Sequence, residues 1–540
     1  MELSMRDKSM GAFIGAVIGD ALGWPNEQNS NCIKGSEYKN SEKGFSSWEK
    51  RCGGRYYPYI DKIDAGSYSD DGQLLIATAR SLISDNWINC FTKIELPLWI
   101  SYERGGGGAT LRASKKWLEG KSPWDISNNI QDRVKYFNAG GNGAAMRILP
   151  HIIYNLDNKK QGLNQVFINS ICTHGHPRAI VGALLYADAL YYLFESKDII
   201  GYGELIDYLI VNKDEWSSNL YIKEVESWRK SIQFSNIEDY LKIWKETVDE
   251  TINLLKIAKE ALSNGLLDIT EKTLEELKCF DRRVNGAGHI TTVISLYLTC
   301  KFASSPELGI IEASNLSKSD NDTICSMMGG LIGAIHGTSF INREWVMVQD
   351  YEYIINLVEK LSNKEKVNIL SNIEAWTYDI DKSFKKTLHM KSKNHILELP
   401  SIGILKIIDK EILKSNIKNK NVIRFKVKSH AGQTLYFTDF TVKEEGNDIK
   451  REEKYSNKKN KVDRYILINN IVTEFLDVLH TRMTAKKFFE LILLIVKECE
   501  VTDNESIVIE SLTKETKQFI YKNKIDESLV NDIISIITKE

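Results

Sequence analysis

The chain has 540 residues, a net charge of −2 and 42% hydrophobic residues. This length is too great for one simple core and predicts two or more domains, while the hydrophobic share is ordinary for a globular protein. The near-neutral charge gives no overall attraction to nucleic acid or to an acidic membrane surface. The eight cysteines form no C-x-x-C pair, so the sequence predicts neither a disulfide framework nor a zinc site.

The N-terminal segment has the outline of a secretory signal, because basic residues precede an apolar run at residues 10–18. The run is short, however, and Asp20 interrupts it. Gly11, Gly15 and Gly19 recur at four-residue spacing and instead predict a helix face that packs closely against a neighbour. Since no other stretch approaches the ~18 apolar residues of a membrane span, we expect a cytoplasmic protein without a membrane partner.

Two acidic stretches stand out as candidate metal ligands. Residues 68–73 read YSDDGQ and residues 319–323 read SDNDT, and each precedes an apolar run that predicts a helix. Their hard oxygen atoms suit Mg²⁺ or Mn²⁺, and a pair of ions ~3.5–4 Å apart is typical of binuclear hydrolases. The candidate ligands are Ser69, Asp70, Asp71, Asp320, Asp322 and Thr323.

Helix capping is the competing interpretation of the same residues. Serine and aspartate are preferred N-caps, and Asp70 with Gln73 fits a capping box. Asp322 or Thr323 would cap the later helix in the same way. Sequence chemistry leaves open whether the two stretches, which lie far apart in the chain, meet in the fold.

Further motifs follow one another in a characteristic order. Residues 11–23 read GAFIGAVIGDALG, and Glu27 follows four residues later. The remaining motifs are RGGGGAT at 104–110, GNGAAMR at 141–147, THGHPRA at 173–179 and DNDT at 320–323. This ordered set, over about residues 8–361, resembles the ADP-ribosylglycohydrolase family, which includes the dinitrogenase reductase-activating glycohydrolases.

The resemblance implies a compact all-α domain at residues 1–361. Residues 362–540 lie outside it, and their own patterns predict a smaller mixed α/β region of unknown role, so we expect a mainly α chain. Helical periodicity and the lack of strand patterns before residue 361 agree with it. A composition shift marks the boundary, because only three of the 34 glycines lie beyond residue 340. In the second region, alternation around a glycine predicts a β-hairpin at about 421–442, and helices are expected at about 465–540.

The resemblance also implies a function. It predicts a metal-dependent hydrolase that removes ADP-ribose from a modified target, with ADP-ribosylated arginine on a protein as the leading candidate. A linkage to serine, to a nucleic-acid base or to a small ester stays open. Two Mg²⁺ ions, with Mn²⁺ as the alternative, would bind the six candidate ligands of the acidic stretches.

Other residues acquire roles from the same resemblance. Glu27 would be the general base, and Asp71 is the second candidate for activating the water. The glycine turn at 141–143 would present free N–H groups to a diphosphate, although an ordinary turn has the same sequence. The expected substrate-binding residues are Asn142, Gly143, Ala144 and His174.

Two departures from the family pattern qualify this assignment. Gly72 stands where the family usually has threonine, so we expect a looser loop. Thr291 replaces a usual aspartate, which puts substrate contacts or support of the site in doubt. Two alternatives therefore stay open: an ADP-ribose-binding pseudoenzyme, or an immunity protein whose region 362–540 blocks a partner ADP-ribosyltransferase.

Overall fold

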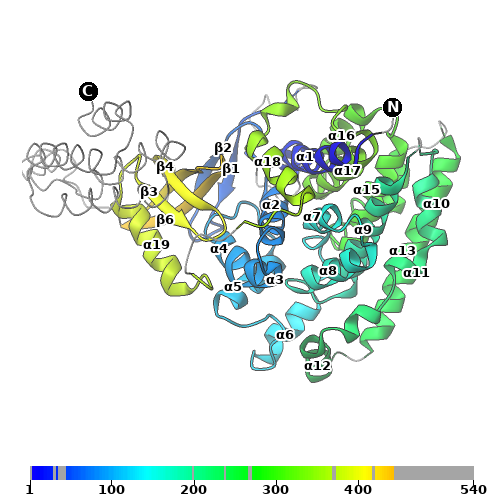
Figure 1. Cartoon of the computed structure of the whole chain (residues 1–540), viewed down its shortest axis with the longest axis horizontal. Coiled ribbons are helices and arrows are strands. Elements are labelled where there is room, and N and C mark those ends of the chain that lie inside the picture. The colour runs from blue at the N-terminus through cyan, green and yellow to red at the C-terminus, as the bar shows by residue number, and fades with distance from the viewer. Residues whose placement is uncertain are drawn as a thin grey trace, which may run out of the picture. The chain divides into compact units, whose positions relative to one another are not determined.

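The structure is a computed structural model that describes residues 3–27, 32–33, 44–197, 200–235, 237, 239–265, 270–367, 373–415, 417 and 420–442. These residues belong to the first of two compact units, Met1–Lys443, and the second unit is Glu444–Glu540 (Figure 1). The helices expected at 465–540 lie outside the described residues.

Helices dominate the described part of the chain before residue 363. The first half contains α1 (Met5–Gly23), η1 (Trp24–Asn26), α2 (Asp70–Leu82), α3 (Trp87–Asn89), η2 (Cys90–Glu95), α4 (Leu96–Trp99), α5 (Gly108–Leu118), α6 (Ile130–Phe137), η3 (Ala145–Arg147), α7 (Leu149–Tyr154), α8 (Lys159–Ile171) and α9 (Pro177–Glu195). The second half contains α10 (Glu204–Val211), α11 (Lys213–Trp216), η4 (Leu220–Lys223), α12 (Glu226–Phe234), α13 (Tyr240–Ser263), α14 (Thr270–Glu276), α15 (Gly288–Lys301), α16 (Pro306–Ser314), α17 (Asn321–His336), η6 (Trp345–Met347) and α18 (Tyr351–Ser362). The predicted all-α character of this region is confirmed in its main features.

Helices α1 and α17 cross at very short range, and glycine makes this possible. A Cβ atom on Gly11 would lie 2.0 Å from the Gly337 carbonyl oxygen, and one on Gly19 would lie 2.1 Å from the Cys325 carbonyl oxygen. Any side chain at these positions would force the helices apart. The predicted glycine face is therefore confirmed. Because Gly23 follows on the same face, the end of α1 lies against the first turn of α17, where a Cβ atom would approach Asp322 to 2.6 Å.

One feature of the helical region contradicts the sequence analysis. Strands β1 (Trp48–Cys52) and β2 (Tyr59–Ile63) form an antiparallel hairpin between α1 and α2, where no strand was predicted. Each strand has only five residues and is rich in charged side chains, so the alternation is too short to register as a strand pattern. The hairpin is stabilised by tertiary contacts, since Trp48 and Ile63 pack on the buried Trp24 ring.

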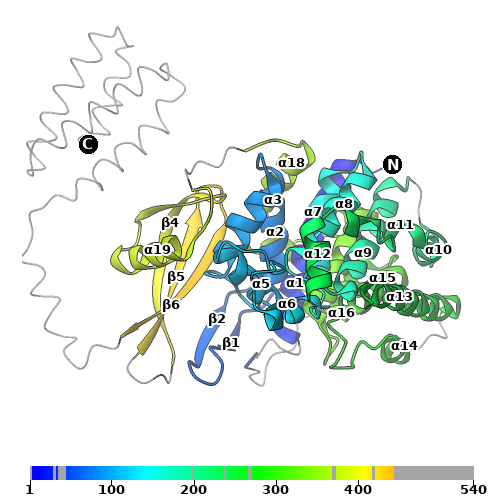
Figure 2. The ribbon, with the colours of Figure 1, turned by 90° about the horizontal axis from the view of Figure 1, so that it is seen from below.

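A four-stranded antiparallel sheet follows the helices. Its strands are β3 (Ile396–Leu399), β4 (Gly403–Leu413), β5 (Lys420–Ser429) and β6 (Thr434–Val442), in the order β3-β4-β5-β6. The last two strands pair in register from Lys420 with Val442 to Lys428 with Thr434, and the turn uses Gly432 at φ 105°. The predicted β-hairpin is confirmed. Helix α19 (Tyr378–Met390) lies beside the sheet (Figure 2) and packs Phe384 on Phe437.

The sheet shares a hydrophobic core with α2 and with η2 and α4, which follow α2 in the chain. Phe437 of β6 lies 5.1 Å from Phe384 and 5.9 Å from Tyr102, measured between ring centroids. Arg80 of α2 donates to Gln433 at the β5–β6 turn at 2.7 Å, and it also binds the buried Glu95 carboxylate. A small mixed α/β region is thus confirmed, and it packs within the same compact unit as the helices. The placement of a domain boundary at residue 361 stays a prediction.

None of the helices in the described ranges combines the length and the hydropathy needed to cross a membrane. The predicted cytoplasmic location stays a prediction.

Candidate active site

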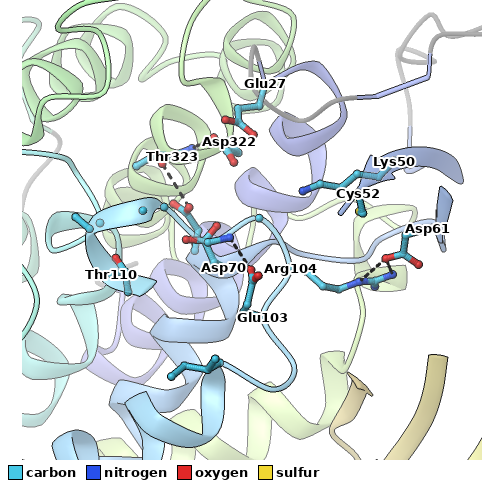
Figure 3. Close-up of a pocket in the computed structure, with 18 of the residues that line it drawn as sticks. Glu27, Lys50, Cys52, Asp61, Asp70, Glu103, Arg104, Thr110, Asp322 and Thr323 are labelled. Atoms are coloured by element: carbon cyan, nitrogen blue, oxygen red, sulfur yellow. Dashed lines mark hydrogen bonds and ion pairs between the residues drawn. The ribbon is translucent and has the colours of Figure 1, made fainter. Parts of the chain in front are cut away.

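The two acidic stretches meet in the fold. Thr323, in the first turn of α17, places its hydroxyl 3.4 Å from an Asp71 carboxylate oxygen in the first turn of α2. Both helices point their N-termini at the same space, so their partial positive charges favour acidic side chains there. The crossing of α1 with α17 adds Glu27, which follows η1, to the same space (Figure 3).

Helix capping explains only one of the candidate ligands. Ser69 is the N-cap of α2, and its hydroxyl oxygen accepts a hydrogen bond from the Asp71 backbone N–H at 3.2 Å. The capping box predicted for Asp70 and Gln73 is wrong. The Gln73 amide reaches away from the helix end and donates to the Tyr102 carbonyl, because a buried partner is available there.

The later helix also fails to use its acidic residues as expected caps. Asp320 stands at the N-cap position of α17, but its side chain makes no capping hydrogen bond. Its carboxylate instead accepts a hydrogen bond from the Asn142 amide at 2.8 Å. Asp322 accepts from the adjacent Thr323 N–H at 2.8 Å and also forms a side-chain hydrogen bond with Asp320. The carboxylates therefore turn toward the cavity rather than back onto their own helix.

Asp20 is a residue of the site that the sequence analysis did not assign. It is fully buried in α1 and accepts hydrogen bonds from the backbone N–H groups of Ser69 at 2.9 Å and Gly72 at 2.7 Å. Burial raises the pKa of Asp20 to about 7. Its signal in the sequence was a lone charge within a helix of small apolar residues. Asp20 fixes the turn that presents Asp70 and Asp71.

The looser loop expected from Gly72 is not what the structure shows. A Cβ atom at Gly72 would lie 2.8 Å from the Tyr68 ring, so the missing side chain makes room for that ring. The Tyr68 hydroxyl in turn donates to Asp350 at 2.9 Å. Together with Asp20, these contacts hold the loop firmly. The expectation was wrong because the compensating partners come from distant parts of the chain.

The cluster has the chemistry of a cation site. Carboxylate oxygens of Glu27, Asp320 and Asp322 lie within 4.8 Å of one another. Burial raises the pKa of Asp70 to about 8 and raises those of Asp71, Asp320 and Asp322, and the neighbouring carboxylates add to the rise for Asp70, Asp71 and Asp322. One Asp71 oxygen is buried without any hydrogen-bond partner among the described residues. Because so many buried acids are stable together only when neutralised, these residues fit a bound divalent cation.

A cavity of about 950 Å³ opens above this cluster. One side is formed by the loop at 141–143 with His174, and the opposite side by the β1–β2 hairpin and β6. Figure 3 shows Asp70 and Asp322 between Thr110 on one side and Lys50 with Cys52 on the other. The acidic cluster therefore lies between two walls of different composition.

The first wall contains the predicted substrate-binding residues. Asn142 and Gly143 line the cavity, whereas Ala144 is fully buried beneath them. Asn142 uses its side-chain amide to hold Asp320 and also contacts the Thr291 hydroxyl at 3.2 Å. Thr291 therefore accepts a hydrogen bond from Asn142, so a polar contact with the site persists at this position.

His174 faces the cavity as a neutral side chain. Burial, together with nearby arginine charge, lowers the pKa of His174 to about 3. The Thr173 hydroxyl lies 2.7 Å from His174 Nδ1 and accepts from Arg147 at 2.8 Å. The tautomer that satisfies all three groups has Thr173 donating to Nδ1, so the ring proton is on Nε2. His176 instead caps α9 by accepting from the Arg178 N–H.

The second wall contains charged residues that sequence reasoning missed. Glu103 accepts a hydrogen bond from the Gly106 N–H at 2.9 Å and is the strongest acidic neighbour of Asp70. Lys50 lies 4.8 Å from the centroid of the Trp24 ring and also faces Asp70. A carboxylate beside a run of four glycines was a signal for Glu103. Lys50 gave none, because its strand was not predicted.

Comparisons with known proteins agree with the motif order. A family model described as ADP-ribosylglycohydrolase matches residues 1–369. A curated relative, the ADP-ribosyl-dinitrogen reductase glycohydrolase of Rhodospirillum rubrum, is 25% identical over 197 residues, which cover 36% of this chain and 60% of the relative. A solved structure titled ADP-ribosylglycohydrolase-related protein complex is 18% identical and covers 67% of this chain and 99% of its own, with a TM-score of 0.42.

Proposed function

Because the chain belongs to the ADP-ribosylglycohydrolase family, we propose that it is a metal-dependent hydrolase that releases ADP-ribose from ADP-ribosylated arginine on a protein. Family membership classes the chain as a glycohydrolase enzyme. The named relative acts on ADP-ribosyl-dinitrogen reductase, a modified protein, and this favours a protein target here. The chain spans only 60% of that relative's length. The metal dependence and the arginine linkage are therefore proposed for this chain and are not taken from the relative.

The observation that carries the proposal is the acidic cluster at the meeting point of α1, α2 and α17. Carboxylates that only capped helices would turn back to backbone N–H groups, but Asp320 and Asp322 face the cavity. An unpartnered oxygen on Asp71 supports the same interpretation. A pseudoenzyme with a decayed site would not be expected to keep this full set of ligands.

The proposal assigns two Mg²⁺ ions to this cluster, with Mn²⁺ as the alternative. Bound ions would orient the ribose hydroxyls and lower the pKa of the attacking water. Ser69 would take part through the lone pair that its cap does not use. The proposed ligands are Ser69, Asp70, Asp71, Asp320, Asp322 and Thr323.

Glu27 is the proposed general base. It is half-buried at the edge of the cluster and lines the cavity. It would take a proton from the water that attacks the anomeric carbon of the distal ribose, and the carbon–nitrogen bond to the guanidine would break as the guanidine nitrogen gains a proton. Asp71 is the alternative base, but one of its oxygens already accepts from Thr323.

The first wall of the cavity is the proposed site of the nucleotide. No protein acceptor binds the backbone N–H group of Gly143 among the described residues, and Gly143 lines the cavity, whereas the neighbouring Ala144 is buried. Such N–H groups at the start of a helical turn suit a diphosphate. A Cβ atom at Gly143 would lie 3.0 Å from His174, so glycine keeps this approach open. His174, with its proton on Nε2, would donate to a ribose or phosphate oxygen.

The test is the release of free ADP-ribose from an arginine-ADP-ribosylated protein, with Mg²⁺ and with a chelator. We expect release with Mg²⁺ only, and a loss of about 10³-fold in the Asp320→Asn/Asp322→Asn double variant. The Asp249→Asn variant changes an exposed acid on α13 and is the matched control.

Release that persists with the chelator would contradict the metal dependence. If nothing is released, a titration with ADP-ribose on the same sample separates the remaining cases. Tight binding would indicate another linkage or a pseudoenzyme, and no binding would reject the assignment of the cavity.

A further inference from the structure

The second wall of the cavity combines the β1–β2 hairpin, which lies within the family match, with strand β6, which lies beyond it. That match ends at residue 369, yet Tyr436, Thr438 and Phe440 of β6 line the same cavity as the acidic cluster. Phe440 packs beside the β1–β2 hairpin, which contributes Tyr59 to the same wall. If the first wall holds the nucleotide, the second wall is the part of the cavity left for the target that carries it.

Buried ion pairs attach this wall to the helical region. Asp61 of β2 binds Arg104 at 2.8 Å and also binds Arg424 of β5, and all three side chains are buried. The Arg104 guanidinium stacks 4.2 Å from the centroid of the Tyr436 ring. Ile60 donates from its backbone to the Lys414 carbonyl at 3.0 Å. The wall is therefore held in place by the fold and does not depend on a ligand.

The outer edge of the wall carries an exposed aromatic cluster. Phe440 lies 5.5 Å from Tyr57 and 6.5 Å from Tyr59, between ring centroids. Lys420 lies 5.2 Å from the centroid of the Tyr57 ring. Tyr56, next along the hairpin turn, is 80% exposed. Large aromatic side chains at this exposure are typical of contact surfaces for a partner.

Basic residues flank these aromatics without matching acids. Arg51 and Arg55 are exposed on the hairpin, and neither has an ion-pair partner among the described residues. The nearby Asp61 carboxylate already binds two arginines. We call this surface the rim patch; it consists of Arg51, Arg55, Tyr56, Tyr57, Lys420 and Phe440.

We propose that the rim patch docks an acidic segment of the modified protein, next to the residue that carries ADP-ribose. This inference rests on the proposed function and adds the class of target. Exposed guanidinium and ammonium groups attract carboxylates, and the aromatic rings supply contact area at small entropic cost. The patch lies at the mouth of the cavity, so a segment bound there places its modified residue over the acidic cluster.

Two synthetic peptides test the proposal with the full chain. Each carries one ADP-ribosyl-arginine and a fluorescent label, and the flanking residues are four glutamates in one and four lysines in the other. Fluorescence anisotropy at low salt measures binding, and release of ADP-ribose is followed in the same samples. We expect the acidic peptide to bind about tenfold more tightly, and salt to reduce the difference.

Variants of the patch must remove this preference. Arg51→Glu/Arg55→Glu should abolish it or reverse it, and Phe440→Ala should weaken binding of the acidic peptide about fivefold. Arg229→Glu and Phe234→Ala are matched controls, because both residues are exposed and lie on helix α12, outside the rim patch. These controls should keep the preference of the unaltered chain.

Equal binding of the two peptides, or a preference that survives the double variant, would overturn the proposal. So would displacement of the acidic peptide by a single-stranded oligonucleotide at a lower concentration than by an unlabelled acidic peptide, since it would assign the patch to a polynucleotide. A retained preference without release of ADP-ribose supports the docking site and rejects the proposed hydrolysis, so the two failures are distinguishable.

Discussion

The two walls of the cavity differ in how they are built. The acidic cluster comes from the first turns of α2 and α17, and its residues lie close together within two short motifs. The second wall takes several residues from the β1–β2 hairpin and several from β6, and these two segments meet only in the tertiary structure. The acidic cluster thus belongs to the part matched by the family, while β6 lies beyond the matched residues. This division separates the proposed chemistry of the site from its proposed choice of target.

The largest expected effect is a loss of kcat when the acidic cluster alone is altered. Asp71→Ala removes the carboxylate that joins α2 to Thr323 and should lower kcat about 10³-fold. Thr438→Ala, on the opposite wall, should lower kcat far less and change KM for a modified protein instead. Steady-state kinetics on one arginine-ADP-ribosylated protein compare the two variants. Equal losses of kcat would show that the two walls do not divide the work.

The next largest effect concerns the buried ion pairs that anchor the second wall, and it is measured as a change in stability. Asp61→Ala leaves the buried Arg104 and Arg424 without their shared partner and should lower the free energy of unfolding by about 3 kcal/mol. Asp64→Ala is the matched control, because Asp64 pairs with a half-exposed Lys426 and should cost less than about 1 kcal/mol. Urea unfolding measures both. A cost for Asp61→Ala no larger than the control would mean that the wall is not anchored by this pair.

A smaller effect concerns the support of the acidic cluster. Asp20→Asn offers one acceptor oxygen to the Ser69 and Gly72 N–H groups, where the carboxylate offers two. The turn should loosen, and Mn²⁺ affinity should fall about tenfold to a hundredfold. Calorimetric titration with Mn²⁺ measures this, with Asp249→Asn as the exposed control. Unchanged Mn²⁺ affinity would limit Asp20 to a packing role.

The smallest effect concerns the pH dependence of stability that one buried histidine of the helical region causes. Burial lowers the pKa of His151 in α7 to about 4, below its unfolded value of about 6.5. The unfolded chain therefore binds a proton that the folded chain excludes. The resulting stability is present above pH 6.5 and is lost as pH falls toward 4. At pH 5.5 the loss amounts to about 1 kcal/mol of unfolding free energy.

The His151→Phe variant tests this assignment. Phenylalanine keeps a ring against Trp87 but cannot titrate, so between pH 7 and 5.5 the variant should be spared the loss of about 1 kcal/mol that this histidine causes in the unaltered chain. His430→Phe, in the exposed β5–β6 turn, should keep the original slope. Thermal unfolding at the two pH values provides the comparison, and an unchanged slope in His151→Phe would assign the acid sensitivity to other groups.

Local patterns predicted much of the fold and the acidic ligands. The glycine spacing of α1, the β5–β6 alternation and the aspartates before α2 and α17 each depend on residues close together in the chain. The β1–β2 hairpin escaped prediction because its strands are short and gain stability from Trp24 rather than from their own pattern. The capping box at Asp70 failed because Gln73 found a buried partner in Tyr102.

The sequence by itself determined the family, the helical framework and the residue types of the acidic cluster, since helix ends and hydrophobic periodicity are local properties. Only the tertiary structure decided which of these residues cap helices and which face the cavity. Asn142 holds Asp320 away from its helix, and Asp20 fixes the turn before Asp70. The second wall likewise depends on Asp61 joining Arg104 to Arg424. Such contacts join distant segments through packing, and no local pattern encodes which distant groups will meet.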